Sequence, residues 1–259
     1  MWPHRLPVSG FEVTVQPPTG MEDLLLQEAR VLDTALAFRL FDRLVTISHG
    51  AAANWSGLAV TDLEALLLLL RLATLGDVVH AETNCLAARC GARVDVSFRV
   101  KDYLASQTPR MPRGVQKIEG TECYRLAAPD VSFRLPNGGD LFAIDHRGIL
   151  EREMMQRCVQ PAEVPARVRR RIDLAMEALA PRLSRTMNAE CPECRATMNF
   201  YFDVRQFVLN ELREHAATIF EDVHLLASYY KWREADILAL PRSRRARYAE
   251  ALRGRWGAA

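Results

Sequence analysis

Residues 85–100 read CLAARCGARVDVSFRV, and residues 191–204 read CPECRATMNFYFDV. In both stretches a close pair of cysteines leads into alternating apolar and polar residues, the pattern of a half-buried strand. The alternating apolar residues are Val94, Val96, Phe98 and Val100 in the first stretch and Met198, Phe200, Phe202 and Val204 in the second. We therefore expect two equivalent cysteine turns, each followed by a strand, that share one sheet and form a zinc-ribbon-like element.

The four cysteines of these turns, Cys85, Cys90, Cys191 and Cys194, are the predicted ligands of one structural zinc ion. Zinc takes four ligands in a tetrahedron, and a tight turn with two cysteines presents two thiolates at once. A proline inside the second turn is typical of a zinc knuckle, and Gly91 after the first turn lets the backbone bend under the metal. Four sulfur ligands leave no open position for water, so catalysis by the metal is not expected.

Other interpretations of the cysteines are less favoured. Six cysteines in 259 residues, four of them in two tight pairs, fit a metal site in a reducing compartment better than a disulfide framework. Ordinary burial in a core is the main alternative. A thioredoxin-like redox pair should open a helix, whereas Cys191 and Cys194 precede a strand. Cys123 and Cys158 have no partner at ligand spacing, and core burial is the favoured interpretation for both.

The elements around the two turns recur in the same order, which predicts a degenerate internal duplication. FEVTVQPPTG at 11–20 and VSFRLPNGG at 131–139 each read as a strand, a turn with proline and glycine, and the start of a helix. Helical segments, a cysteine turn and a strand follow in both cases. The predicted class is α+β, with two degenerate strand-turn-helix halves joined by the zinc-ribbon-like element and a helical C-terminal region.

The predicted boundaries are 1–104 for the first half, 105–121 for an exposed linker, 122–212 for the second half and 213–259 for a helical C-terminal module. The linker carries prolines and few apolar residues. Within the first half, residues 61–77 predict a central helix that is apolar nearly all round. Thr61 is its expected N-cap, Glu64 completes a capping box, and Gly76 is the expected C-cap.

Composition, at 49% hydrophobic and 25% charged residues with a net charge of +2, is that of an ordinary globular protein. This balance excludes a polyanion-binding surface over the whole molecule. The N-terminal residues lack the apolar segment of a secretory signal, and no apolar run reaches the roughly 20 residues of a membrane span. A cytoplasmic location is therefore expected. Phosphate-loop, dinucleotide-binding and zinc-protease motifs are absent, and His224 lacks a second catalytic partner, so we do not expect an enzyme.

The C-terminal module carries the predicted partner-binding residues. They are Tyr230, Trp232, Leu240, Arg244, Arg245 and Tyr248. The aromatic and apolar members offer more surface than two short terminal helices can bury, and the arginines flank them. Aromatic anchors with a charged rim are the composition of a protein interface. In the competing account these anchors dock on the chain's own long helix and leave the arginines for a phosphate backbone.

The run EDVHLLASYYKWREADILALPRSRRARYAEAL at 221–252 resembles the end of the T-even-type phage baseplate hub assembly proteins and their relatives in contractile injection systems. The matching positions are His224, Leu226, Ala227, Tyr230, Trp232, Ile237, Leu238, Leu240, Pro241, Arg244, Arg245 and Tyr248. FRLPNGGDL at 133–141, RCV at 157–159 and CPEC at 191–194 also resemble that family. The resemblance implies a small cytoplasmic factor that helps to build the hub of a contractile tail, with no reaction assigned.

The leading hypothesis is a zinc-containing assembly chaperone or minor baseplate component that binds hub or spike proteins and no membrane. The alternative is a zinc-ribbon nucleic-acid-binding or regulatory protein, because clustered arginines can neutralise phosphates. Nucleic acid is the less expected partner, since arginine runs are more often solvated helix faces.

Overall fold

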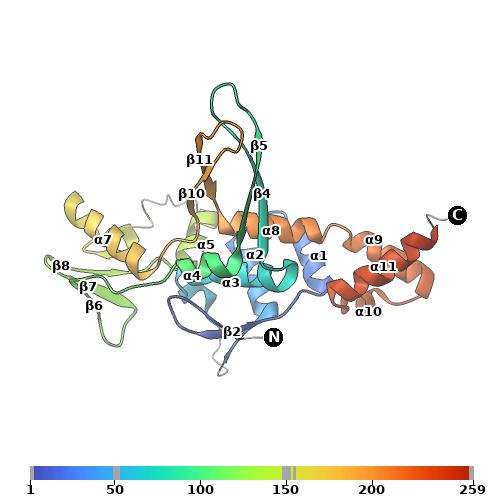
Figure 1. The fold of residues 1–259 in the computed structure, drawn as a ribbon. Coiled ribbons are helices and arrows are strands. Elements are labelled where there is room, and N and C mark those ends of the chain that lie inside the picture. Colours follow the sequence, from blue (N-terminus) through green and yellow to red (C-terminus); the bar gives the residue numbers. More distant parts are fainter. Residues whose placement is uncertain (1–2, 49–52, 148–152, 154–155, 257–259) are drawn as a thin grey trace.

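The computed structural model describes residues 3–256 apart from 49–52, 148–152 and 154–155. Helices occur together with small antiparallel sheets, which confirms the predicted α+β class. Figure 1 shows a helical centre from which three parts extend: a lobe with a sheet, an arm of two hairpins and the C-terminal helices. No helix within the described ranges is both long enough and apolar enough to cross a membrane.

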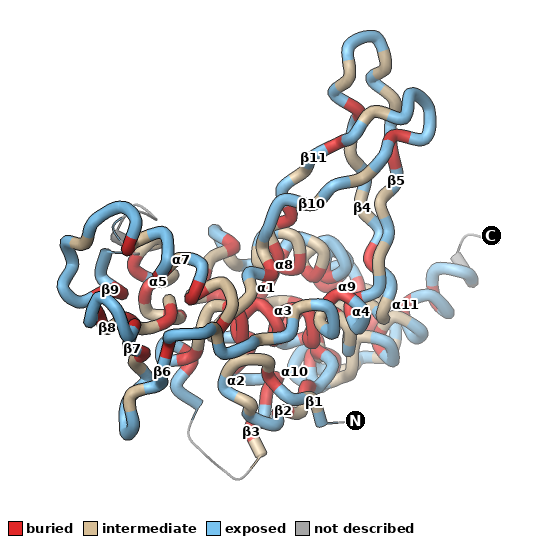
Figure 2. Tube along the Cα trace, turned by 60° about the vertical axis from the view of Figure 1, so that its left-hand side comes forward, coloured by how far each residue is buried: buried red, intermediate tan, exposed pale blue. Residues whose placement is uncertain are grey.

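The helical centre is built around α3 (Val60–Leu75). Its residues 61–71 are all buried, which confirms the prediction of a central helix. The other helices of the centre are α1 (Gly20–Glu28), α2 (Thr34–Leu44), α4 (Val100–Ser106), α5 (Gly138–Arg147) and α8 (Val204–His215). A short 3-10 helix (Trp55–Gly57) and a sheet of β1 (His4–Arg5), β2 (Glu12–Val15) and β3 (Val45–Ile47) complete it. Buried residues gather in these helices in Figure 2.

The start of α3 differs from the predicted capping box. The helix begins at Val60 after Ala59, and no side chain caps it. The Thr61 hydroxyl instead donates to the Pro181 carbonyl oxygen at 3.1 Å. Glu64 accepts hydrogen bonds from the backbone and hydroxyl of Ser184. Contacts with a distant segment thus take the place of the local cap. The predicted C-cap is confirmed, because the backbone ends the helix at Gly76 with φ of 91°.

Two antiparallel hairpins form the arm. β4 (Val78–Asn84) pairs with β5 (Arg93–Arg99), and β10 (Arg185–Glu190) pairs with β11 (Thr197–Phe202). The strands after the cysteine turns are therefore confirmed, but the expectation that they share one sheet is wrong. Each pairs with the strand before its own turn, and the hairpins meet through inward side chains instead. Val100 and Val204, expected at strand ends, begin α4 and α8.

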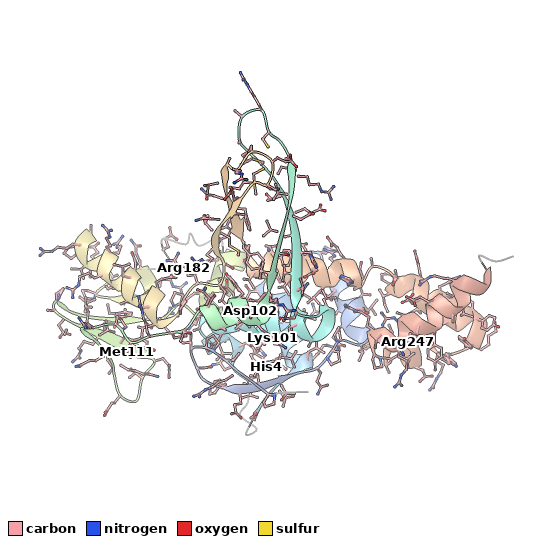
Figure 3. All side chains as sticks on the ribbon, in the orientation of Figure 1. His4, Lys101, Asp102, Met111, Arg182 and Arg247 are labelled. Atoms are coloured by element: carbon pink, nitrogen blue, oxygen red, sulfur yellow. The ribbon has the colours of Figure 1, made fainter. Side chains whose placement is uncertain are left out.

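The sheet lobe has its own core. Its strands, in spatial order, are β6 (Val115–Lys117), β7 (Cys123–Ala127), β8 (Asp130–Arg134) and β9 (Val159–Gln160), and α7 (Ala166–Leu179) packs on them. The expected linker, 105–121, contains β6, because Val115 is buried opposite Leu126. The residues around Met111, which Figure 3 labels on the lobe's surface, form an exposed connection, and the turn at 119–121 between β6 and β7 is exposed as well.

The two turns with proline and glycine lie in equivalent surroundings, which supports an internal duplication. Residues 18–20 pair with 240–242 at the start of α11 (Arg242–Trp256), and residues 136–138 pair with 58–60 at the start of α3. At the first turn, Arg242 N–H donates to Pro18 O and Gly20 N–H donates to Leu240 O, both at 3.2 Å. At the second turn, Val60 N–H donates to Pro136 O and Gly138 N–H donates to Leu58 O, both at 3.0 Å. Each turn therefore docks on a helix start that is distant in sequence.

Replacing Gly138 with Ala is expected to destabilise the protein by about 1–3 kcal/mol, as overpacking does. An added Cβ would lie 2.5 Å from the backbone oxygen of Trp55 and 2.8 Å from the Phe38 ring. Gly139→Ala is the matched control, because its nearest neighbour would be 3.4 Å away. Urea unfolding of both variants measures the difference. Equal free energies of unfolding would show that this turn is not closely packed.

The C-terminal helices are α9 (Ile219–Tyr230), α10 (Glu234–Leu238) and α11. Arg245 of α11 is only 1% exposed and forms ion pairs with Asp23 of α1 and with Asp222 of α9, the latter at 3.2 Å. Arg242 also pairs with Asp23, and Arg253 pairs with Asp222 at 2.6 Å. This ion-pair network, Asp23, Asp222, Arg242, Arg245 and Arg253, attaches the C-terminal helices to the centre.

Candidate metal centre

The two cysteine turns at the tip of the arm have similar backbones. In each turn the N–H of the first cysteine donates to a carbonyl across the turn, from Cys85 to Ala92 at 2.8 Å and from Cys191 to Ala196 at 3.0 Å. The residue directly after each second cysteine is left-handed, with φ of 62° at Gly91 and 58° at Arg195. Glycine adopts this conformation without strain, which explains its place in the first turn.

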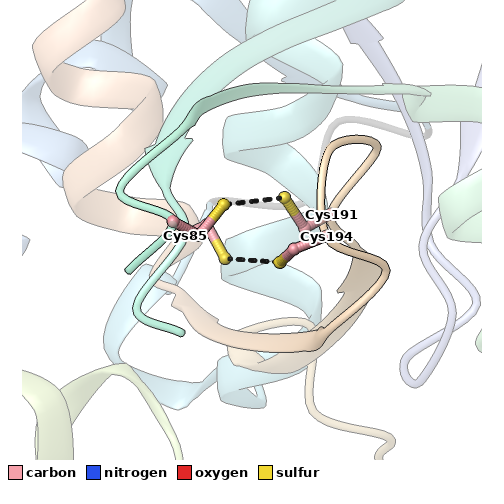
Figure 4. A group of neighbouring side chains, drawn as sticks. Cys85, Cys191 and Cys194 are labelled. Atoms are coloured by element: carbon pink, nitrogen blue, oxygen red, sulfur yellow. Dashed lines mark hydrogen bonds between the residues drawn. The ribbon is translucent and has the colours of Figure 1, made fainter. Parts of the chain in front are cut away.

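The four sulfur atoms of Cys85, Cys90, Cys191 and Cys194 lie within 4.8 Å of one another. Cys85 Sγ is 3.6 Å from Cys194 Sγ, and Cys90 Sγ is 3.8 Å from Cys191 Sγ; Figure 4 shows the two turns facing each other. A disulfide would need about 2.05 Å. Four sulfurs arranged tetrahedrally about 2.3 Å from a zinc ion are about 3.8 Å apart. The cluster can therefore hold one metal ion.

Backbone N–H groups beside the sulfurs favour the thiolate form. The N–H of Cys194, joined by that of Glu193, lowers the pKa of Cys191 to about 7. At Cys90 the Ala92 N–H acts in the same direction, but contact with Cys194 and desolvation outweigh it and raise the pKa to about 12. The first thiolate of the cluster therefore forms readily, and its negative charge disfavours ionisation of the neighbouring thiols. A bound cation would let all four thiols ionise.

Apart from its cysteines, the arm has little core near the tip. Val94 and Met198 are buried there beside Cys85 and Cys191, and most of the partly buried neighbours are alanines. Leu86 at the tip is 90% exposed, and the arm is largely exposed in Figure 2. An isolated two-stranded hairpin is at best marginally stable. A metal ion would supply the cohesion that this small core lacks.

The other two cysteines lie in the sheet lobe, outside the cluster. Cys158 is buried, as predicted, with Sγ 3.8 Å from Asp140 Oδ2. Burial, followed by the charge of Asp140, raises the pKa of Cys158 to about 12. Cys123 is only half-buried at the start of β7, so the core interpretation holds less well for it. His224 is exposed on α9 and lines a shallow hollow with Phe220 and Arg253.

The predicted partner-binding residues fall into two groups. Tyr230, Trp232 and Tyr248 form an aromatic cluster in which the Trp232 ring centroid lies 4.8 Å from that of Tyr230 and 5.2 Å from that of Tyr248. Tyr248 is 38% exposed, and Arg244 is exposed beside it on α11. These residues can contribute to a surface. Figure 3 shows Arg247 on the same part of the molecule.

The second group packs against the rest of the chain. Leu240 is half-buried at the backbone pairing with Gly20. Arg245, expected at the charged rim, is buried in the ion-pair network and does not reach the surface. An arginine is rarely fully buried unless it is paired. Its partner Asp23 lies in a helix at the other end of the sequence, so the local run of arginines gave no sign of this burial.

Comparisons with known proteins give no relative for this chain: no protein-family model, no curated protein and no solved structure matches it.

Proposed function

We propose that the chain is a zinc-containing assembly factor, a chaperone or minor component, of the baseplate hub of a contractile phage tail or injection system. Its role is to bind hub or spike proteins in the cytoplasm, and it catalyses no reaction. The resemblance at 221–252 supplies the family. The observation that carries the binding role is the aromatic cluster of Tyr230, Trp232 and Tyr248, which keeps exposed surface although its rings pack on each other.

The metal in this proposal is zinc. Tetrahedral four-thiolate sites suit zinc or iron. A proline-containing C-x-x-C turn is typical of a structural zinc site, and four sulfur ligands would leave no coordination position open for a reaction. The ion would hold β4–β5 against β10–β11, segments that are distant in sequence. The arm would then be a rigid projection that presents Leu86 and the surrounding tip to a partner.

The resembling C-terminal motif divides into packing and surface positions. Leu226, Ile237 and Leu238 are buried, and Arg245 joins them in the interior. These positions would preserve the module's shape. The aromatic cluster, with Arg244 and Arg247 exposed near it, supplies the proposed contact surface.

Trp232→Ala is expected to weaken capture of the hub partner by about 30-fold or more, because a buried aromatic anchor contributes about 2 kcal/mol or more at an interface. Pull-down of candidate hub and spike proteins with immobilised, metal-loaded protein measures this. Phe11→Ala is the matched control, since Phe11 is 44% exposed on a different part of the chain. Tyr248→Ala is a second variant of the cluster. It is expected to disturb the fold less than Trp232→Ala, because Tyr248 is 38% exposed.

Unchanged capture by both cluster variants would contradict the assignment of the aromatic cluster as the contact surface.

The charge test uses Arg244→Glu/Arg247→Glu, because both arginines are exposed and neither belongs to the ion-pair network. Binding of nucleic acid that is lost in this variant and falls steeply with salt would favour the nucleic-acid-binding alternative instead.

A further inference from the structure

A cavity of about 320 Å³ lies where the sheet lobe meets the helical centre. α2, α3, α5 and α7 form its walls, and the first residues of α8 and the end of β11 lie at its edge. Phe41, Leu63, Leu67 and Met176 are among the buried side chains that line it. Its size is at the lower end of the range of about 300–1,000 Å³ for ligand pockets, which are typically apolar with a few polar groups.

Arg182 lies at this junction, between α7 and the base of the arm in Figure 3. Its guanidinium pairs with Glu177 at 3.1 Å. The other arginine of the cavity, Arg205, pairs with Asp145 at 2.5 Å and donates to the Thr34 hydroxyl at 2.7 Å. Both cationic side chains of the lining therefore have an anionic partner already.

The remaining charged groups of the lining are two carboxylates, Glu64 and Asp203. Glu64 is 9% exposed and accepts two hydrogen bonds from Ser184, at 2.6 and 3.1 Å. Asp203 accepts the Gln206 N–H at 3.0 Å as the N-cap of α8. In the part of the chain that the structure describes, no lysine or arginine forms an ion pair with either carboxylate. An ionised carboxylate offers about four acceptor positions and no donor, so these groups retain acceptor capacity.

Burial contributes most to raising the pKa of Glu64, and the nearby charge of Asp203 raises it further. Both carboxylates belong to the lining of the same cavity. A cation beside them would relieve this repulsion and the cost of burying charge.

We propose that this cavity binds an apolar group that carries one cationic nitrogen, either a small alkyl or aryl amine or the side chain of a lysine from a partner protein. The apolar body fills the space between Phe41, Leu67 and Met176. The ammonium donates to Glu64 and Asp203. This site is separate from the metal centre and from the C-terminal surface. Amine binding here does not depend on the proposed assembly role.

The test compares n-hexylamine with 1-hexanol as probes of the metal-loaded, full-length protein. The two probes have the same chain length and differ in charge. Titrations followed by amide chemical shifts give both affinities and show whether residues of α2 and α3 respond. Hexylammonium is expected to bind about tenfold or more tightly than the alcohol, as a charge-assisted hydrogen bond would require.

The variant Glu64→Gln/Asp203→Asn is expected to remove this preference. Glutamine can still bond to Ser184, and asparagine remains a good N-cap, so the fold is retained. Unchanged affinity for 1-hexanol in the variant shows that the cavity is intact. Glu12→Gln, an exposed carboxylate on β2, is the matched control and should keep the preference.

Equal affinity for the two probes in the unmodified protein would overturn the proposal. A preference for hexylamine that survives in the double variant, or chemical-shift changes confined to regions other than the cavity, would overturn it as well. A capped Leu-Lys-Leu peptide distinguishes the two sources of the amine. Tighter binding of the peptide than of hexylamine assigns the site to a partner's lysine, and weaker binding assigns it to a free amine.

Discussion

Removing the metal from the cluster, or replacing Cys191 with Ser, is expected to unfold the arm while the helical centre stays folded. Amide hydrogens in 78–99 and 185–202 should lose protection by a factor of about 100 or more, because structural zinc contributes several kcal/mol to the folding of the segments that bind it. The physical reason is the small core at the tip, where Val94 and Met198 are the buried apolar residues other than the cysteines.

Hydrogen exchange with mass spectrometry, before and after chelation, measures this effect. α3 serves as the internal reference, since its residues 61–71 are buried in the centre. Cys123→Ser is the matched variant, because Cys123 lies outside the cluster in the sheet lobe. An arm that keeps its protection after the metal has been removed would contradict a structural role for the ion.

Arg245→Met is expected to destabilise the protein by about 3–5 kcal/mol, the usual effect of breaking a buried ion pair from one side. Methionine fills much of the space but leaves Asp23 and Asp222, which are 0% and 1% exposed, without their shared partner. Arg242 and Arg253 still reach one carboxylate each, so the lower part of that range is expected.

Urea unfolding of Arg245→Met beside Arg244→Met gives the comparison. Arg244 is the exposed neighbour on the same helix, and surface changes of this kind are usually within about 0.5 kcal/mol. A similar free energy of unfolding for the two variants would show that the ion-pair network does not hold the C-terminal helices in place.

Local patterns in the sequence were sufficient to predict the cysteine cluster and the strands that follow it. Two short cysteine spacings predict a metal site, and the alternation of Val94, Val96 and Phe98 predicts β5. The same alternation says nothing about which strand lies beside it. β4 pairs with β5, and β10 pairs with β11. The inward side chains of β4 and β10 are mostly small or weakly apolar, so the strand pattern of these two segments is faint.

Features that depend on distant contacts could not be read from the sequence. Thr61 and Glu64 have the spacing of a capping box, yet Pro181 and Ser184 bind them from a segment that is remote in the chain. Arg245 lies in a run of arginines that resembles a solvated helix face, yet its side chain is buried and forms ion pairs with Asp23 and Asp222. The cavity beside Glu64 and Asp203 likewise forms only when several helices pack together.

Metal analysis of protein purified under reducing conditions decides whether the four cysteines bind a structural zinc ion. Elemental analysis combined with X-ray absorption at the metal edge gives the identity, the stoichiometry and the ligand distances. We predict one zinc ion per chain with four sulfur ligands at about 2.3 Å. Protein that is folded but contains no metal, or a metal bound by fewer than four sulfurs, would contradict the assignment of Cys85, Cys90, Cys191 and Cys194 as a structural zinc site.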